Sequence, residues 1–218
     1  MTTTSGAIGS HARIVNWIGD AWNEIQTAHD DWDWLRSSSI LGGGISFTTT
    51  SGLATYPLGT GAGTVGVLAD NFGKWDRETF RCFTTTAGNI NEIFVDHVPY
   101  DTYRDAYIFG AMRQVTTRSI AFAVGPDQSI NLGPPPTSQY TITGDYWQAP
   151  SLMSGDTDVP TGLPLRFHML IVYLTMMKYG RYESAMEVYQ RGMEEYNKMY
   201  SQLEAARMPK ITWAGALA

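Results

Sequence analysis

The chain has 218 residues and a net charge of −6, which together narrow the classes of protein it can belong to. A surface that grips nucleic acid needs a clustered basic patch, and the acidic balance argues against one. The single cysteine, Cys82, excludes an intrachain disulfide framework and fits folding in a reducing cytoplasm. The longest apolar run, Met169 to Met177, is far too short to span a membrane, and the first residues lack the apolar core of a secretory signal. We therefore expect a soluble protein.

Charged residues are sparse in this chain, and aromatic residues are abundant. Charged side chains make up 17% of the sequence, against roughly 25% in a typical soluble domain. The composition includes Tyr 12, Trp 7 and Met 10, which are side chains enriched at protein interfaces. Two interpretations stay open: neighbouring chains cover much of the surface, or the core is rich in aromatic residues.

A helix is expected near the start of the chain, over residues 13–29, after a small and polar segment at residues 1–10. Its apolar residues fall on one helical stripe: Ile14, Trp17, Ile18, Ala21, Trp22 and Ile25. The string DDWDWLR (Asp30–Arg36) ends this helix, and its two tryptophans have the spacing of a strand or a tight turn.

Residues 40–124 have the composition of short strands and turns. Runs rich in Thr, Phe, Ile and Val alternate with glycine clusters, and these runs are ISFTTT, TYPL, VGVL, ETFRCFTTT, EIFVDHV and SIAFAV. A helical spacing interrupts them at residues 99–113, where Tyr100, Tyr103, Tyr107 and Met112 share one side.

Further strands are expected on both sides of a proline run. A turn at Gly125-Pro126-Asp127 separates residues 119–124 from residues 129–132. The next strand covers residues 140–146, and we interpret it as forming a strand pair with residues 129–132, broken by Pro134, Pro135 and Pro136.

Two helices are expected near the carboxyl end. Residues 165–179 are strongly apolar, and Gly180 has the character of a helix stop. The second helix, residues 182–206, carries apolar and aromatic residues at alternating four- and three-residue steps: Tyr182, Met186, Tyr189, Met193, Tyr196, Tyr200 and Leu203. A seam of this kind packs along another helix.

Pro209 ends the last helix and leaves a tail that is too short to fold alone. The tail still holds Ile211, Trp213 and Leu217, and an indole in such a segment is costly to leave in water. We interpret these apolar residues as a segment that docks on a partner. The alternative is a terminus that folds back on its own domain.

These elements predict an α+β fold. Its antiparallel α-helical bundle is formed by the N- and C-terminal helices, with an inserted antiparallel β domain and an extended C-terminal tail. We expect residues 1–218 to form a single unit. Within it, residues 11–30 and 164–206 form the helical bundle and residues 37–150 the mainly β region, with a helix near 99–113. Residues 207–218 form the docking tail.

Candidate chemistry along the chain is weak. Residues 61–66 read GAGTVG and match a dinucleotide fingerprint in letters. The preceding TYPL holds a proline, however, and the following VGVLADNFG has glycines that would break a helix, so we expect a loop. The acids Asp30, Asp31 and Asp33 could hold a cation, and so could Asp156 and Asp158. The alternative for the first group is that the acids are solvated beside buried indoles. The alternative for the second group is that the acids lie near the start of a helix, where the helix dipole favours them.

The remaining reactive side chains are also expected to be structural. His11, His29, His97 and His168 have no metal-ligand spacing. We expect His97 at a strand edge, His168 as a hydrogen-bonded core residue and Cys82 as a small buried hydrophobe. The sequence predicts no catalytic residue, no metal site, no cofactor and no enzyme.

Several strings resemble head-to-tail adaptor proteins of tailed bacteriophages. They are WDWLR at residues 32–36, INLGPPP and YTITGDYW within residues 130–147, DVPTGLPLRFHMLIVY at residues 158–173, and GRYE at residues 180–183. The resemblance extends from about Trp17 to Leu203.

The resemblance implies a helical bundle with an inserted β domain, assembled as a ring of twelve copies under the portal protein. It implies a virion protein of the head–tail junction, made in the host cytoplasm, through whose lumen DNA passes without sequence-specific binding. The tail would clamp the portal through Met208, Pro209, Ile211, Trp213 and Leu217. Loops at residues 42–44, 59–66 and 134–136 would face neighbouring subunits or downstream tail or nozzle proteins. The alternatives are another neck or tail-completion (stopper) component, or a nucleotide-binding enzyme.

Overall fold

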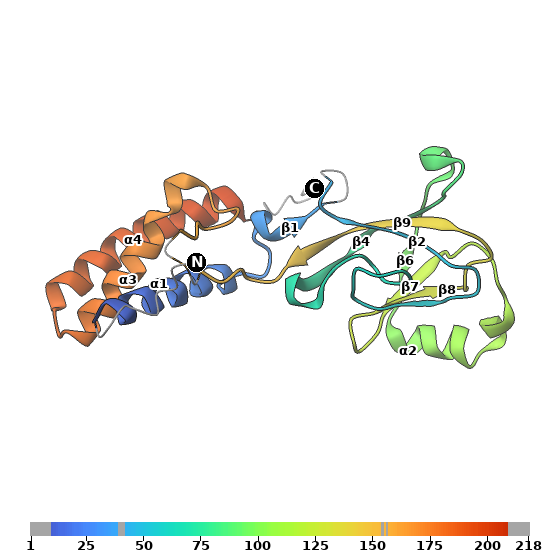
Figure 1. The fold of residues 1–218 in the computed structure, drawn as a ribbon, viewed down its shortest axis with the longest axis horizontal. Coiled ribbons are helices and arrows are strands. Elements are labelled where there is room, and N and C mark those ends of the chain that lie inside the picture. The colour runs from blue at the N-terminus through green and yellow to red at the C-terminus, as the bar shows by residue number, and fades with distance from the viewer. Residues whose placement is uncertain (1–9, 39–41, 154, 156, 209–218) are drawn as a thin grey trace, which may run out of the picture. The chain divides into compact units, whose positions relative to one another are not determined.

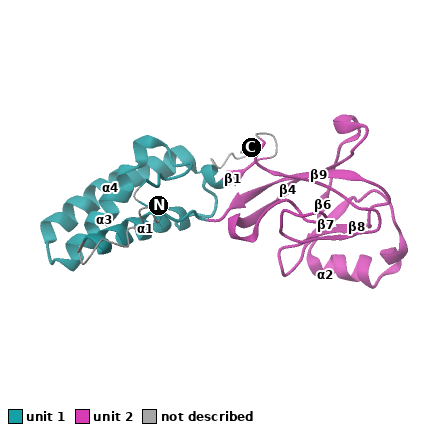
Figure 2. Cartoon of the chain, in the orientation of Figure 1, with its two compact units in different colours: residues 1–35, 150–218 teal, residues 36–149 magenta. Residues whose placement is uncertain are grey.

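The chain folds into two compact units. A computed structural model describes residues 10–38, 42–153, 155 and 157–208. Unit 1 contains residues 1–35 and 150–218, and unit 2 contains residues 36–149 (Figures 1 and 2). Helices from both ends of the chain and a mainly antiparallel β region between them confirm the predicted α+β class.

The described residues of unit 1 form the helices α1 (Ser10–Thr27), α3 (Met169–Tyr182) and α4 (Met186–Arg207). The α3 helix packs against both α1 and α4 (Figure 1). The predicted stripe of α1 is confirmed, because Ala21, Trp22 and Ile25 are fully buried. Within the described residues, no helix combines the length and apolarity that crossing a bilayer would require.

The junction between α3 and α4 differs from the prediction. The α3 helix does not stop at Gly180 but continues to Tyr182, and α4 begins at Met186 rather than at Tyr182. The backbone N–H of Ala185 donates to the carbonyl of Gly180 at 2.9 Å, and Ser184 adopts a positive φ of 56°. The chain therefore reverses at Ser184, four residues after the predicted stop.

Two sheets are formed by the part of unit 2 that the structure describes. The first has the order β1-β9-β4-β5, with β2 also paired to β9, and the second has the order β3-β8-β7-β6. The strands of the first sheet are β1 (Arg36–Ser37), β2 (Ile45–Thr48), β4 (Phe72–Thr84), β5 (Ile93–Phe94) and β9 (Tyr140–Gln148). Those of the second are β3 (Thr55–Tyr56), β6 (Asp96–His97), β7 (Ala121–Val124) and β8 (Ile130–Gly133). Neighbouring strands run antiparallel except β6 and β7, which are parallel.

The proline run carries the chain from one sheet to the other. The predicted pairing of residues 129–132 with residues 140–146 is wrong, because β8 pairs with β3 and β7 whereas β9 pairs with β1, β2 and β4. Proline has no N–H to donate to a strand ladder, so pairing ends at Gly133. The predicted turn at Gly125-Pro126-Asp127 is confirmed as the connection between β7 and β8.

Three other predicted elements are only partly correct. VGVL forms a single bridge, between Val67 and Gly59, rather than a strand. EIFVDHV forms two short strands, β5 and β6, each in a different sheet. The helix predicted at residues 99–113 is broken into α2 (Tyr100–Tyr103), a π-helical turn at residues 104–108 and a 3-10 turn at residues 111–114.

An aromatic core joins the two sheets of unit 2. Phe80 of β4 stacks on Phe122 of β7 with ring centroids 4.2 Å apart, and both are almost completely buried. Cys82 is fully buried in the same cluster, which confirms its predicted role as a small hydrophobe. Burial raises the pKa of its thiol, so the unreactive protonated form is favoured. The aromatic composition is thus accounted for in part by this core.

Candidate functional site

The predicted seam of α4 lies along its contact with the rest of unit 1. Burial increases along the helix, because Met186 at its start is exposed, Tyr189, Met193, Tyr196 and Tyr200 are half-buried, and Leu203 is fully buried. Tyr182, the first predicted seam residue, instead lies at the end of α3. Burial raises the pKa of the Tyr196 hydroxyl and of the Tyr200 hydroxyl.

Two glycines bring α3 and α4 into close contact. A Cβ atom at Gly180 would lie 2.7 Å from the backbone nitrogen of Tyr189, and one at Gly192 would lie 2.9 Å from the carbonyl oxygen of Tyr173. These distances are shorter than real Cβ contacts. Gly180 therefore serves helix packing and not helix termination.

An aromatic and cationic cluster lies where α1 contacts the end of α3. Trp17 of α1 lies beside Tyr179 and Tyr182, with ring centroids 6.4 and 5.5 Å away. The guanidinium of Arg13 lies 4.1 Å from the centre of the Tyr182 ring. Tyr182 is 53% exposed and Met186 is 63% exposed. Trp, Tyr, Met and Arg are the side chains enriched at protein interfaces, so this hairpin cluster is a candidate contact surface.

The opposite end of α4 contacts the WDWLR segment. Trp32 is fully buried and its indole N–H donates to the carbonyl of Ile25 at 2.9 Å. Asp33 accepts a hydrogen bond from Arg207 at 2.8 Å, and His29 lies 2.9 Å from Glu204. The predicted pattern of solvated acids beside buried indoles is thus confirmed for Asp33 and Trp32. Sequence reasoning missed the partners on α4, which are distant along the chain.

The predicted docking tail begins where α4 ends. Met208 leaves the helix with extended backbone angles, and its N–H donates to the carbonyl of Glu204 at 2.9 Å. Pro209, Ile211, Trp213 and Leu217 lie outside the described residues.

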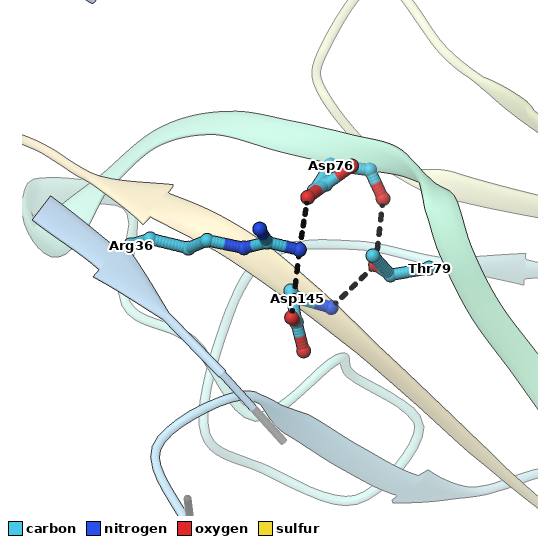
Figure 3. A network of polar contacts seen from close by, with 4 residues as sticks. All are labelled: Arg36, Asp76, Thr79 and Asp145. Atoms are coloured by element: carbon cyan, nitrogen blue, oxygen red, sulfur yellow. Dashed lines mark hydrogen bonds and ion pairs between the residues drawn. The ribbon is translucent and has the colours of Figure 1, made fainter. Parts of the chain in front are cut away.

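A charged network lies on the first sheet of unit 2 (Figure 3). Arg36 donates to Asp76 at 2.7 Å and to Asp145 at 3.2 Å. The hydroxyl of Thr79 accepts from the backbone N–H of Asp145 and donates to the backbone carbonyl of Asp76, each at 2.9 Å. A groove beside this network is lined by both acidic and basic side chains, including Arg81 and Glu92, which pair at 2.9 Å. Its mixed charge favours no single class of ligand.

Unit 2 also exposes several large apolar side chains. Ile90 is 96% exposed on the connection between β4 and β5, and Phe94 and Phe109 are 59% and 71% exposed. Of the proline loop at residues 134–136, which is predicted to face neighbouring subunits or tail proteins, Pro134 and Pro136 are buried and Pro135 is half-buried, so Pro135 is the part of it that reaches the surface.

The GAGTVG segment is a loop, as predicted. It follows the two-residue strand β3, and the next elements are a 3-10 turn at residues 69–71 and then β4. Val65 is fully buried, and the hydroxyl of Thr64 bonds the carbonyls of Gly59 and Gly61 at 2.7 Å. The loop is closed by its own contacts, and no helix N-terminus follows it to receive a phosphate.

The histidines and acids do not converge. His97 lies in the edge strand β6 with its ring 5.4 Å from that of Phe122, as predicted. His168 precedes α3 and is half-buried, with Nε2 2.9 Å from the carbonyl oxygen of Leu163. Asp158 accepts from the backbone N–H of Gly155, and Asp156 lies outside the described residues. Among the described residues, no group of three or more His, Cys, Asp or Glu side chains is arranged to hold a metal ion.

Comparison with known proteins decides the family. The model of the family described as "SU10 adaptor protein" matches residues 6–216, which is nearly the whole chain. The chain belongs to the SU10 adaptor protein family. The adaptor is therefore a structural protein of the phage virion, and the predicted resemblance to phage head-to-tail adaptors is confirmed. A search of the curated proteins found no match to this adaptor.

Proposed function

We propose that this adaptor assembles into a ring of twelve copies beneath the portal, extends the DNA channel and provides the platform on which the tail is attached. The family match over residues 6–216 is the observation that carries this proposal. Ring closure requires two different patches on each copy, since head-to-tail contacts are heterologous.

The exposed side chains support an obligate assembly. The hairpin cluster of Arg13, Trp17, Tyr179 and Tyr182 joins aromatic and guanidinium groups, and Met186 at the start of α4 is exposed. Unit 2 adds exposed Ile90, Phe94 and Phe109. With charged residues at only 17% of the sequence, contacts between subunits would bury surface that is costly to leave in water.

The acidic balance of the chain supports passage of DNA. A net charge of −6 per copy would be multiplied around a ring, and like charges prevent a polyanion from adhering to the wall of a channel. The mechanism is then mechanical: the ring prolongs the portal channel after packaging, helps to retain the genome and accepts the downstream tail or nozzle proteins.

The experiment that tests this function is assembly of the virion without the protein. A nonsense mutation in its coding sequence should give heads that package DNA but carry no tails, and added purified protein should restore infectivity. Tailed particles in its absence would contradict the proposal.

The same experiment addresses the alternative of a stopper or tail-completion component. Heads without the proposed adaptor should lack every neck and tail component below the portal, since the adaptor is their platform. If another ring is already bound to the portal in these heads, the protein acts further down the neck.

A further inference from the structure

Two polar pairs connect the last turn of α4 to the segment that follows α1. Leu203 is fully buried, but Ala205 and Ala206, in the following turn, are exposed. The Oε1 atom of Glu204 lies 2.9 Å from Nε2 of His29, and Nη1 of Arg207 lies 2.8 Å from Oδ2 of Asp33. The last four carbonyls of a helix have no intrahelical partner, so a helix end without such contacts frays.

The two anchors come from one short segment that is itself fixed. Trp32, between His29 and Asp33, is fully buried and donates its indole N–H to Ile25. The His29 ring meets the Trp32 ring edge-on at 4.9 Å, and Trp34 stacks on Trp32 at 4.3 Å. These contacts, together with Tyr200 of α4, whose ring lies 6.3 Å from that of His29, position His29 and Asp33 beside the end of α4.

The geometry of the pairs makes them act together. Glu204 and Arg207 are three residues apart and so lie on the same side of the helix. The four side chains are between 31% and 48% exposed, and a single pair of this kind contributes little. Two such pairs, at positions three residues apart on the helix, together restrain the last turn more than either pair alone would.

We propose that His29, Asp33, Glu204 and Arg207 form a tail-root clamp that sets the direction in which the chain leaves α4 at Met208. This inference rests on the proposed function, together with the prediction that residues 208–218 dock on the portal. Holding the root of a docking segment in place reduces the conformational entropy that binding must overcome. The clamp would therefore strengthen portal binding without touching the portal.

The test compares Asp33→Ala/Glu204→Ala, which removes both anchor contacts, with the wild type. Hydrogen exchange of the backbone amides of residues 205–208 should be about tenfold faster in the free variant. Affinity for the purified portal should fall about tenfold, because binding must then overcome the larger conformational entropy of an unrestrained chain end. Ring mass should stay unchanged. The matched control is Glu24→Ala, which breaks the 3.0 Å pair between Glu24 and Lys178 in the same unit and should change neither value.

A charge exchange separates positioning from general stability. Asp33→Arg and Arg207→Asp alone should each weaken portal binding, and the two together should restore it. Unchanged exchange and unchanged portal affinity in the double alanine variant would overturn the clamp while leaving the proposed function intact. Wild-type protein that forms rings but ignores the portal would overturn the proposed docking and the purpose of the clamp with it.

Discussion

Arg36 lies between two carboxylates that oppose each other across neighbouring strands. Asp76 of β4 and Asp145 of β9 are register partners, and like charges in that position destabilise a sheet. The Asp145 side chain is 7% exposed and that of Asp76 is 19% exposed, so solvent screens their repulsion poorly. Arg36 contacts both carboxylates and offsets this repulsion.

Replacing this cation should therefore destabilise unit 2. We expect Arg36→Met to lower the free energy of unfolding by about 1–2 kcal/mol, since two largely buried carboxylates lose their shared cation. Arg36→Lys, which keeps the charge, should lose less than half of that. Urea unfolding followed by tryptophan fluorescence measures both, and equal stability of Arg36→Met and the wild type would contradict this interpretation.

His97 gives unit 2 a pH dependence. Burial, and then the nearby charge of Arg77, lower the pKa of its imidazole. The unfolded chain therefore takes up a proton at a higher pH than the folded chain, near the ordinary histidine pKa of about 6.5. The stability contributed by neutral His97 is complete above that value and is lost as the pH falls through the folded-state pKa.

The prediction is a smaller acid sensitivity once this imidazole is removed. Between about pH 7.5 and pH 5.5, the urea midpoint should fall less for His97→Gln than for the wild type. His11→Gln, at an exposed position, is the control and should behave as the wild type does. Identical pH profiles for His97→Gln and the wild type would exclude a role for this side chain.

At the scale of elements, the α3–α4 hairpin depends on two glycines in close helix contact. In an ordinary exposed helix, replacing glycine by alanine stabilises by up to about 1 kcal/mol. Here Gly180→Ala or Gly192→Ala should instead destabilise unit 1 by about 1–3 kcal/mol, because the added methyl meets backbone of the facing helix. Thermal unfolding followed by circular dichroism shows whether each substitution raises or lowers the stability.

Gly61→Ala is the control for this effect. Nothing lies within 4 Å of a Cβ atom at Gly61, so the substitution should be within about 0.5 kcal/mol of neutral. A stabilising effect at Gly180 would show that helix propensity outweighs the close contact, contrary to our account.

Elements with a strong local period could be predicted from the sequence, and pairings between distant segments could not. The stripe from Ile14 to Ile25 correctly placed α1, and the spacing from Met186 to Leu203 placed α4. The separation of β8 from β9 was missed, because the partner of a strand is decided by packing across the whole unit. Gly180 was misread for the same reason: its role depends on Tyr189 on the next helix.

The candidate contact surfaces could likewise be predicted where they lie on one helix, and not where they join segments that are distant in the sequence. The seam residues from Met186 to Leu203 were visible in the spacing of one helix. The hairpin cluster and the tail-root clamp were not, since Arg13 meets Tyr182, and Asp33 meets Arg207, only after folding. The letters of GAGTVG suggested a nucleotide site, and its missing context correctly indicated a loop.

At the scale of the whole molecule, the chain combines a helical unit with an inserted β unit, each with its own core. Family membership identifies a structural adaptor, and the sparse charge and exposed aromatic groups suit a protein that functions only when assembled. We propose that the C-terminal segment, residues 208–218, binds the portal. The other exposed surfaces would then contact neighbouring subunits and the proteins of the phage tail.

The central proposal is tested most directly by the mass of the purified protein mixed with its portal, for the full chain and for a chain lacking residues 208–218. We predict that the full chain forms a complex with equal numbers of both subunits, and that this complex is lost on truncation. A stable monomer that is indifferent to the portal, with or without its tail, would contradict the proposed function.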